Sequence, residues 1–269
     1  MDARPIGVFD SGLGGLTTVK KLAESLPGEN IIYLGDTGRV PYGSRSRETI
    51  IKYARQDAAF LSGFGIKAMV IACNTACSAA YELLDRAYDM PVYEVVNAPA
   101  KAAVSRTTNG RVGVIGTAAT IRSGAYEAAL LKASPGIHVF STACPLFVPL
   151  VENGRTCETD IAALTIAEDY LEGLREAGVD TLIMGCTHYP LLRGVIAKVM
   201  GPGVALIDSG AETAKLMADD LSTRDMLSGR DADGMIKYFV TDSIDGFSSL
   251  ASLFLESDVR GMVEQITLE

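Results

Sequence analysis

The stretch AMVIACNTACSAA, from Ala68 to Ala80, decides the fold and contains the first candidate site residue. Its first half is an unbroken apolar run, which is typical of a strand in a parallel sheet that helices cover on both faces. Its second half, rich in small residues, predicts a helix that begins close to Cys73. We therefore expect a thiol at the point where a buried strand ends and a helix starts.

The same arrangement occurs again in DTLIMGCTHYP, from Asp180 to Pro190, which places Cys186 at the end of a second apolar run. A weak internal repeat supports this correspondence. IGVFDSG at Ile6–Gly12 resembles VGVIGTA at Val112–Ala118 with an offset of 106 residues, and Cys186 follows Cys73 by 113 residues. Each half of the chain thus offers a loop with a hydroxyl group first and a loop with a cysteine later.

Short apolar runs alternate with helical patterns along the chain, which is typical of βαβ units that build parallel sheets. We predict an α/β protein with two pseudo-symmetric lobes, each a mostly parallel sheet flanked by helices, and an active site in the cleft between them. The first lobe is expected to comprise residues 1–97 and 209–269, and the second residues 98–208. Strands are expected at residues 6–10, 31–36, 68–73, 91–96, 111–117, 137–142, 181–186, 205–210 and 238–242, and helices near 14–26, 46–62 and 159–177.

The composition, 48% hydrophobic and 21% charged, is that of an ordinary globular protein. No apolar run approaches the roughly 18 residues that a membrane span needs, and the start of the chain lacks the layout of a secretory signal. The net charge of −9 repels phosphate backbones and anionic lipids, so neither nucleic acid nor a membrane is expected as the main partner. The five cysteines are an odd number, which favours free thiols in a reducing, cytoplasmic environment.

Two glycine-rich loops follow predicted strands. The loop FDSGLGG contains Asp10 and three glycines that let the backbone approach a ligand closely, although it matches no phosphate-binding motif. A small ligand with both carboxylate and ammonium groups suits it, whereas Asp10 could equally cap the turn. The loop at residues 35–46 offers backbone N–H groups and the hydroxyl group of Tyr42, and its alternative reading is a plain turn held by Pro41 and Gly43.

The two strand-end thiols are candidates for proton transfer. A helix start favours the thiolate, and lowering a thiol pKa from about 8.5 to about 7 requires roughly 2 kcal/mol. His188 stands two residues after Cys186 and could tune that thiol or donate a proton, whereas Glu152 lies in a turn pattern and could be merely exposed. Buried cysteines are more often inert. No zinc-spaced motif is present, so no metal is expected.

The motifs DSGLGG, VPYG, ACNTA, VENG and GCTHYP, in this order over nearly the whole chain, resemble the cofactor-independent aspartate/glutamate racemase family. The resemblance implies two lobes with a substrate buried between them and two cysteines, Cys73 and Cys186, that act as opposed acid and base. It implies that three further residues assist the thiols: Asp10, Glu152 and His188. It also implies that the amino acid is held by Asp10, Ser11, Pro41, Tyr42, Gly43, Asn74, Thr75, Thr187 and His188, with Thr117 and Thr120 as further contacts.

The activity that the resemblance implies is the interconversion of L-glutamate and D-glutamate, which supplies D-glutamate for peptidoglycan in the cytoplasm of a bacterium. The resemblance also suggests a homodimer. No lysine stands in a motif that suggests a pyridoxal Schiff base, so no cofactor is expected. Alternatives are a related two-cysteine enzyme (an aspartate racemase, a hydantoin racemase or a maleate isomerase), a redox or metal-binding cysteine module, and a protein that mainly binds another macromolecule, for instance as an inhibitor.

Overall fold

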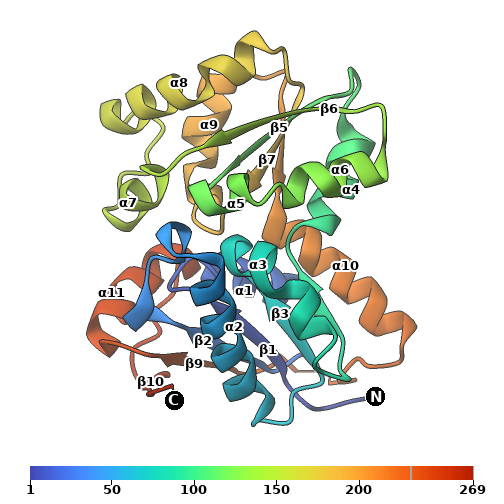
Figure 1. The fold of residues 1–269 in the computed structure, drawn as a ribbon. Helices are drawn as coiled ribbons and strands as arrows, with labels where there is room; N and C mark the ends of the chain where they lie inside the picture. Colours follow the sequence, from blue (N-terminus) through green and yellow to red (C-terminus); the bar gives the residue numbers. More distant parts are fainter. Residues whose placement is uncertain (231, 269) are drawn as a thin grey trace.

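The computed structural model describes residues 1–230 and 232–268 and consists of two stacked lobes, each built on a parallel sheet (Figure 1). The sheet of the first lobe has six strands in the order β10-β9-β2-β1-β3-β4. Its strands are β1 (Ile6–Asp10), β2 (Ile31–Gly35), β3 (Ala68–Ile71), β4 (Val92–Glu94), β9 (Ile236–Val240) and β10 (Val263–Gln265). All of their pairings are parallel, so the carboxyl ends of these strands share one edge of the sheet.

The sheet of the second lobe has four parallel strands in the order β6-β5-β7-β8. These strands are β5 (Arg111–Gly116), β6 (His138–Ala143), β7 (Thr181–Gly185) and β8 (Ala205–Asp208). The order matches β2-β1-β3-β4 of the first lobe, so β5 corresponds to β1 and β7 corresponds to β3. The internal repeat in the sequence therefore reflects two similarly ordered sheets, and the predicted α/β class is confirmed.

Helices cover both faces of the sheets because neighbouring side chains of a strand point to opposite sides. Val8 and Val70 belong to the core that contains the apolar residues of helix α1 (Leu16–Ser25), whereas Phe9 and Ile71 belong to the core that contains those of helix α2 (Arg47–Ser62). This is why the strands are continuous apolar runs.

The helices are α1 (Leu16–Ser25), α2 (Arg47–Ser62), α3 (Asn74–Asp85), α4 (Asn97–Arg106), α5 (Ala118–Arg122), α6 (Ala125–Ala133), α7 (Phe147–Glu152), α8 (Ile161–Glu176), α9 (Arg193–Met200), α10 (Ser209–Thr223) and α11 (Ile244–Leu255), with short 3₁₀ turns η1 (Thr37–Arg39), η2 (Tyr42–Ser44) and η3 (Tyr189–Leu192).

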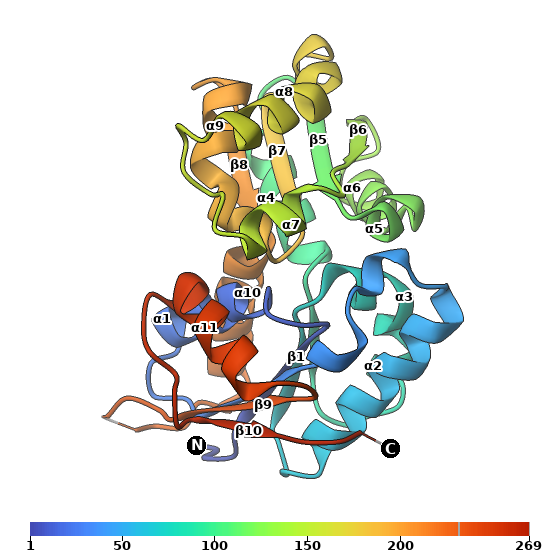
Figure 2. The same ribbon diagram turned by 90° about the vertical axis from the view of Figure 1, so that its left-hand side faces the viewer.

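The chain passes between the lobes at α4 and α10, which pack against each other (Figure 2). Helix α4 follows β4 of the first sheet and packs against α6 and β7 of the second lobe. Helix α10 follows β8 of the second sheet and packs against α1 of the first lobe. The division of the chain at residues 97 and 209 remains a prediction.

The final strand of the first sheet was not expected from the sequence. Strand β10 has only three residues, pairs with β9 alone and is mostly exposed, so it carries no apolar run that would mark it. The predicted helix at residues 46–62 is α2, where the Ser46 side chain accepts a hydrogen bond from the backbone N–H of Thr49 and so caps the helix start. Among the described helices, none combines the length and the apolar character that crossing a membrane requires.

Candidate active site

The loops that follow the strand ends of both sheets enclose a cavity of about 550 Å³ between the lobes. The first lobe contributes the loops after β1, β2 and β3, and the second lobe contributes those after β5, β6 and β7. This is the position where open parallel sheets bind ligands. A larger cavity of about 790 Å³ opens beside α10, but neither Cys73 nor Cys186 lines it.

Most of the residues predicted for the site line the cavity of about 550 Å³. These are Ser11, Pro41, Tyr42, Gly43, Cys73, Asn74, Thr75, Thr117, Glu152, Cys186, Thr187 and His188. Asp10 and Thr120 do not line it and lie directly behind it: Asp10 accepts a hydrogen bond from the backbone N–H of Gly12, and the hydroxyl of Thr120 lies 3.0 Å from that of Thr117. The structure thus brings the predicted residues together from six loops, while their roles in catalysis and binding remain predictions.

Cys73 occupies the turn between β3 and α3. Its Sγ accepts the backbone N–H of Ala76 at 3.4 Å, which makes it the N-cap of α3, and its thiol donates to the hydroxyl oxygen of Ser11 at 3.4 Å. The side chain is buried, with 5% of its surface exposed. Burial raises the pKa of Cys73 to about 11, with a further increase from the negative charge of Asp10, whereas the hydrogen bonds lower it.

Cys186 lines the cavity from the second lobe, between β7 and η3. Its Sγ is 4.0 Å from Nδ1 of His188, and Nε2 of the same ring is 3.2 Å from Oε1 of Glu152. Burial raises the pKa of Cys186, whereas a hydrogen bond from the backbone N–H of His188 lowers it. A negative charge on Cys73 would raise the pKa of Cys186 further, because both thiols line the same cavity. The contact with Glu152 aligns the imidazole ring, so His188 links the carboxylate to the thiol.

Backbone N–H groups at both strand ends favour the thiolates, as expected, but the net pKa of both thiols is raised. Both sulfur atoms do accept hydrogen bonds from backbone N–H groups, but desolvation of the thiolate outweighs this stabilisation at both sites. Burial therefore disfavours the thiolate form of both cysteines in the free protein.

Asp10 is a buried carboxyl group, with 1% of its surface exposed. Its Oδ2 accepts the backbone N–H of Gly12 at 2.9 Å, and within the described part of the chain its Oδ1 has no hydrogen-bond partner. Burial raises its pKa, while positive charge on His188 and the N–H groups of its own loop lower it. Asp10 thus combines the turn-capping role with a free acceptor just behind the cavity wall.

The structure also corrects the expectation for Tyr42. Its hydroxyl group is directed away from the cavity and contacts the side chains of Asp36 and Asp57. Tyr42 lines the cavity, but its hydroxyl group is engaged by these two carboxyl groups.

The two lobes touch on both sides of the cavity. On one side the hydroxyl of Thr17 donates to the backbone oxygen of Thr187 at 2.9 Å, and Gly14 packs so closely that an added Cβ would lie 2.1 Å from Oγ1 of Thr187. On the other side the hydroxyls of Thr75 and Thr117 lie 2.9 Å apart. Predicted substrate contacts thus also join the lobes.

Sequence reasoning missed Arg122, which lines the cavity from α5, and the Asp36–Asp57 pair beneath the loop that carries Tyr42. Asp36 directly follows β2, and Asp10 is the last residue of the neighbouring strand β1, so a position at a strand end was the available signal. Asp57 stands within α2, where nothing local distinguishes it from a solvent-facing residue. Among the described residues, no three His, Cys, Asp or Glu side chains are grouped so as to hold a metal ion, and all five cysteines are free.

Each lobe is built on a parallel sheet, and each places a cysteine from the end of a strand in the shared cavity. The protein is therefore a two-lobed α/β protein with a paired-cysteine site. The chain belongs to the Asp/Glu/hydantoin racemase family, whose profile matches residues 6–217. It is 48% identical to a glutamate racemase of Geobacter metallireducens over 100% of this chain and 98% of that protein.

Solved structures show the same similarity. A glutamate racemase isoform of Bacillus anthracis superposes with a TM-score of 0.94 at 38% identity, covering 100% of this chain and 99% of the other. A glutamate racemase of Francisella tularensis, solved in complex with D-glutamate, gives a TM-score of 0.92 at 38% identity with the same coverage.

Proposed function

We propose that this chain is a cofactor-independent glutamate racemase that interconverts L-glutamate and D-glutamate by passing a proton between substrate, Cys73 and Cys186. The observation that carries the proposal is that one thiol from each lobe lines the same cavity. The assignment of glutamate as the substrate rests on relatives such as the glutamate racemase that is 48% identical over the full chain.

Inverting a stereocentre by proton transfer requires a base on one face of the α-carbon and an acid on the other. In each direction one cysteine, as the thiolate, removes the α-proton, and the opposite thiol gives its proton to the other face. The site then holds the reverse protonation pattern, ready for the product enantiomer. His188, aligned by Glu152, assists proton transfer at Cys186. Ser11 and Asp10 assist proton transfer at Cys73.

The substrate itself brings a further positive charge, its α-ammonium group, into the site. Because burial raises the pKa of both thiols, an entering α-ammonium group favours the thiolate beside it. Asn74, Thr75, Thr117 and Thr187 offer amide, hydroxyl and backbone groups to the two carboxylates, and the negative charge that develops as the α-proton leaves is stabilised by such donors.

By the same relationship we propose that the product D-glutamate serves peptidoglycan synthesis in a bacterial cytoplasm and that the chain forms a homodimer. Light scattering of the purified protein tests the oligomeric state.

The substrate and the mechanism are tested by incubating the purified protein in heavy water with L-glutamate, D-glutamate or L-aspartate. We expect both glutamate enantiomers to reach an equal mixture, the newly formed enantiomer to carry deuterium at the α-carbon, and aspartate to react far more slowly. Chiral chromatography and mass spectrometry measure both quantities. Equal rates on aspartate, or an unlabelled product, would reject the proposal.

The raised thiol pKa values predict how the activity changes with pH. The base must be a thiolate, and below its pKa the thiolate fraction rises about tenfold per pH unit. Since burial raises the pKa of Cys73 to about 11 and also raises that of Cys186, kcat/KM for either enantiomer should increase from about pH 7 to about pH 9. Initial rates at low substrate concentration measure this. A kcat/KM that falls over this range would contradict it, provided that circular dichroism shows an unchanged fold.

A further inference from the structure

The loop at residues 40–44 forms one wall of the active-site cavity and also touches the second lobe. An added Cβ on Gly43 would lie 3.1 Å from Cβ of Thr117, so a small displacement of this loop changes both the wall and the contact between the lobes. What holds the loop is a buried polar cluster beneath it, formed by Asp36, Arg39, Tyr42 and Asp57.

Arg39 joins the two carboxyl groups of this cluster. Its Nε donates to Oδ2 of Asp36 at 2.6 Å, and its Nη2 donates to Oδ1 of Asp57 at 2.9 Å. The hydroxyl of Thr241 donates to the other oxygen of Asp36, Oδ1, at 2.8 Å. Asp36 thus has a donor other than Tyr42 on each of its two oxygens, whereas Oδ2 of Asp57 faces only the hydroxyl of Tyr42 among the contacts described.

The hydroxyl group of Tyr42 lies between two carboxyl oxygens but has only one proton to donate. It contacts Oδ2 of Asp36 closely and lies 3.0 Å from Oδ2 of Asp57. If both carboxyls were ionised, one of them would face the lone pairs of the phenol oxygen without a proton between them. A proton on Asp57 removes this conflict, because Asp57 then donates to Tyr42 and Tyr42 donates to Asp36.

Charge leads to the same assignment. Asp36 and Asp57 are both fully buried, and the guanidinium of Arg39 is the one cation that contacts them among the described residues. Burial and the negative charge of Asp36 raise the pKa of Asp57 well above its ordinary range, the charge of Asp10 adds to this, and Arg39 and the hydrogen bond with Tyr42 oppose it. With one proton, the cluster becomes a neutral set of one carboxylate and one guanidinium.

We propose that Asp57 carries a proton in the folded protein and acts as a positioning residue, donating to Tyr42 and thereby holding the loop that walls the cavity. The expected change in KM for glutamate rests on the proposed racemase function, whereas the protonation of Asp57 does not. Asp57 does not line the cavity, so it acts through Tyr42 and the backbone of residues 40–44.

The test compares three variants of the full chain: Asp57→Asn, Asp57→Ala and Asp36→Asn. The amide of Asp57→Asn donates to Tyr42 and accepts from Arg39 as a protonated carboxyl does, so its KM for glutamate and its midpoint of thermal unfolding should match the wild type. Asp57→Ala leaves Tyr42 and Arg39 without these partners and should raise KM about tenfold, with a smaller change in kcat. Asp36→Asn, which removes the ionised carboxylate, should be as damaging as Asp57→Ala.

The proposal is overturned if Asp57→Asn raises KM as much as Asp57→Ala, because Asp57 would then be ionised, or if Asp57→Ala leaves KM unchanged, because the loop would not depend on it. Should Asp57→Ala fail to fold, infrared difference spectra of the wild type and Asp57→Asn decide: a protonated-carboxyl band must be present in the first and lost in the second. This spectrum and the unfolding midpoints remain decisive even if the wild type fails to racemise glutamate.

Discussion

Replacing Cys73 or Cys186 with alanine is expected to lower glutamate racemisation in both directions by about 10³- to 10⁴-fold. Each cysteine is the base for one enantiomer and the acid for the other, so neither direction survives the loss of either thiol. Chiral chromatography of reactions started from pure L-glutamate or pure D-glutamate measures both directions for each variant.

The remaining thiol gives a sharper expectation. In heavy water each single variant should exchange the α-proton of one enantiomer only, without inversion, because the one surviving base removes and returns a proton on the same face. The enantiomer that exchanges should be reversed between the Cys73→Ala and Cys186→Ala variants. Exchange of both enantiomers by one variant would show that another group acts as the second base.

Cys144→Ala is the matched control. Cys144 is buried like the two site cysteines, with none of its surface exposed, but it does not line the cavity. The variant should keep racemisation near the wild-type rate at a temperature where it is folded. The two-thiol mechanism fails if Cys144→Ala is as inactive as Cys73→Ala, or if either site variant racemises at the wild-type rate.

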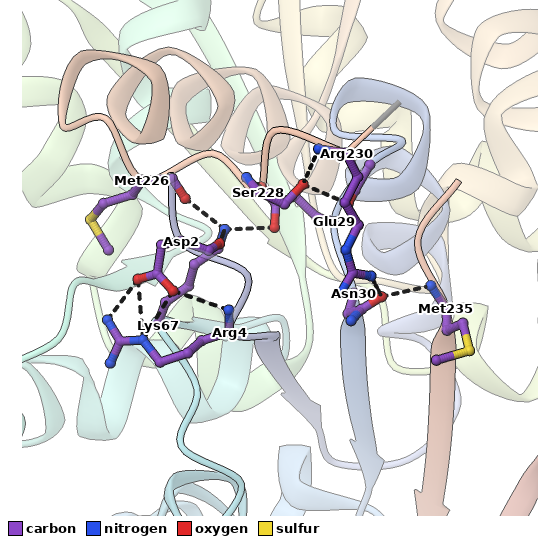
Figure 3. A network of polar contacts seen from close by, with 10 residues as sticks. Asp2, Arg4, Glu29, Asn30, Lys67, Met226, Ser228, Arg230 and Met235 are labelled. Carbon is purple, nitrogen blue, oxygen red and sulfur yellow. Dashed lines mark hydrogen bonds and ion pairs between the residues drawn. The ribbon is translucent and has the colours of Figure 1, made fainter. Parts of the chain in front are cut away.

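Replacing Lys67 with methionine is expected to lower the free energy of unfolding by about 3–5 kcal/mol. The Nζ atom of Lys67 is fully buried and contacts Oε2 of Glu29 at 2.6 Å and the backbone oxygens of Asp2 and Met226 at 2.7 and 2.6 Å (Figure 3). The ammonium group thus makes two hydrogen bonds to backbone oxygens and one ion pair with a buried carboxylate. Methionine fills a similar volume but leaves the carboxylate of Glu29, itself 3% exposed, buried without its counter-charge.

Urea unfolding measures this loss, and the double variant Lys67→Met with Glu29→Leu identifies its cause. Removing both charges should restore part of the stability, because an apolar pair avoids the desolvation of the ions. The cluster lies where β2 and β3 begin, at the end of the sheet away from the cysteines, so KM for glutamate should stay unchanged in both variants. A loss below about 1 kcal/mol in Lys67→Met would show that the ion pair is not required.

The fold and the location of the site were predictable because their signals are local. Continuous apolar runs such as that ending at Ile71 mark strands buried on both faces, and the polar residues directly after them mark the carboxyl edge of a parallel sheet. Cys186 directly follows β7, and Cys73 lies two residues after the end of β3. The topology alone therefore brings both cysteines to one cavity. Strand β10, which pairs at the sheet edge without an apolar run, has no local signal and was missed.

The chemistry of individual groups was less predictable. The hydroxyl of Tyr42 was expected in the cleft, yet it bonds to Asp36 and Asp57 behind it. The backbone N–H groups beside the two cysteines favour the thiolates as expected, yet burial outweighs them and raises the pKa of both thiols.

By itself the sequence determined that this protein has two similar parallel α/β lobes and that a cysteine follows a central strand in each, because apolar periodicity and strand-end position act over a few neighbouring residues. Only the tertiary structure decided which side chains face the cavity, how far burial raises the pKa of the thiols and where a buried carboxyl must keep its proton. Those properties depend on how much water is excluded and on which distant charges come within a few ångströms, and both are set by packing between segments far apart in the chain.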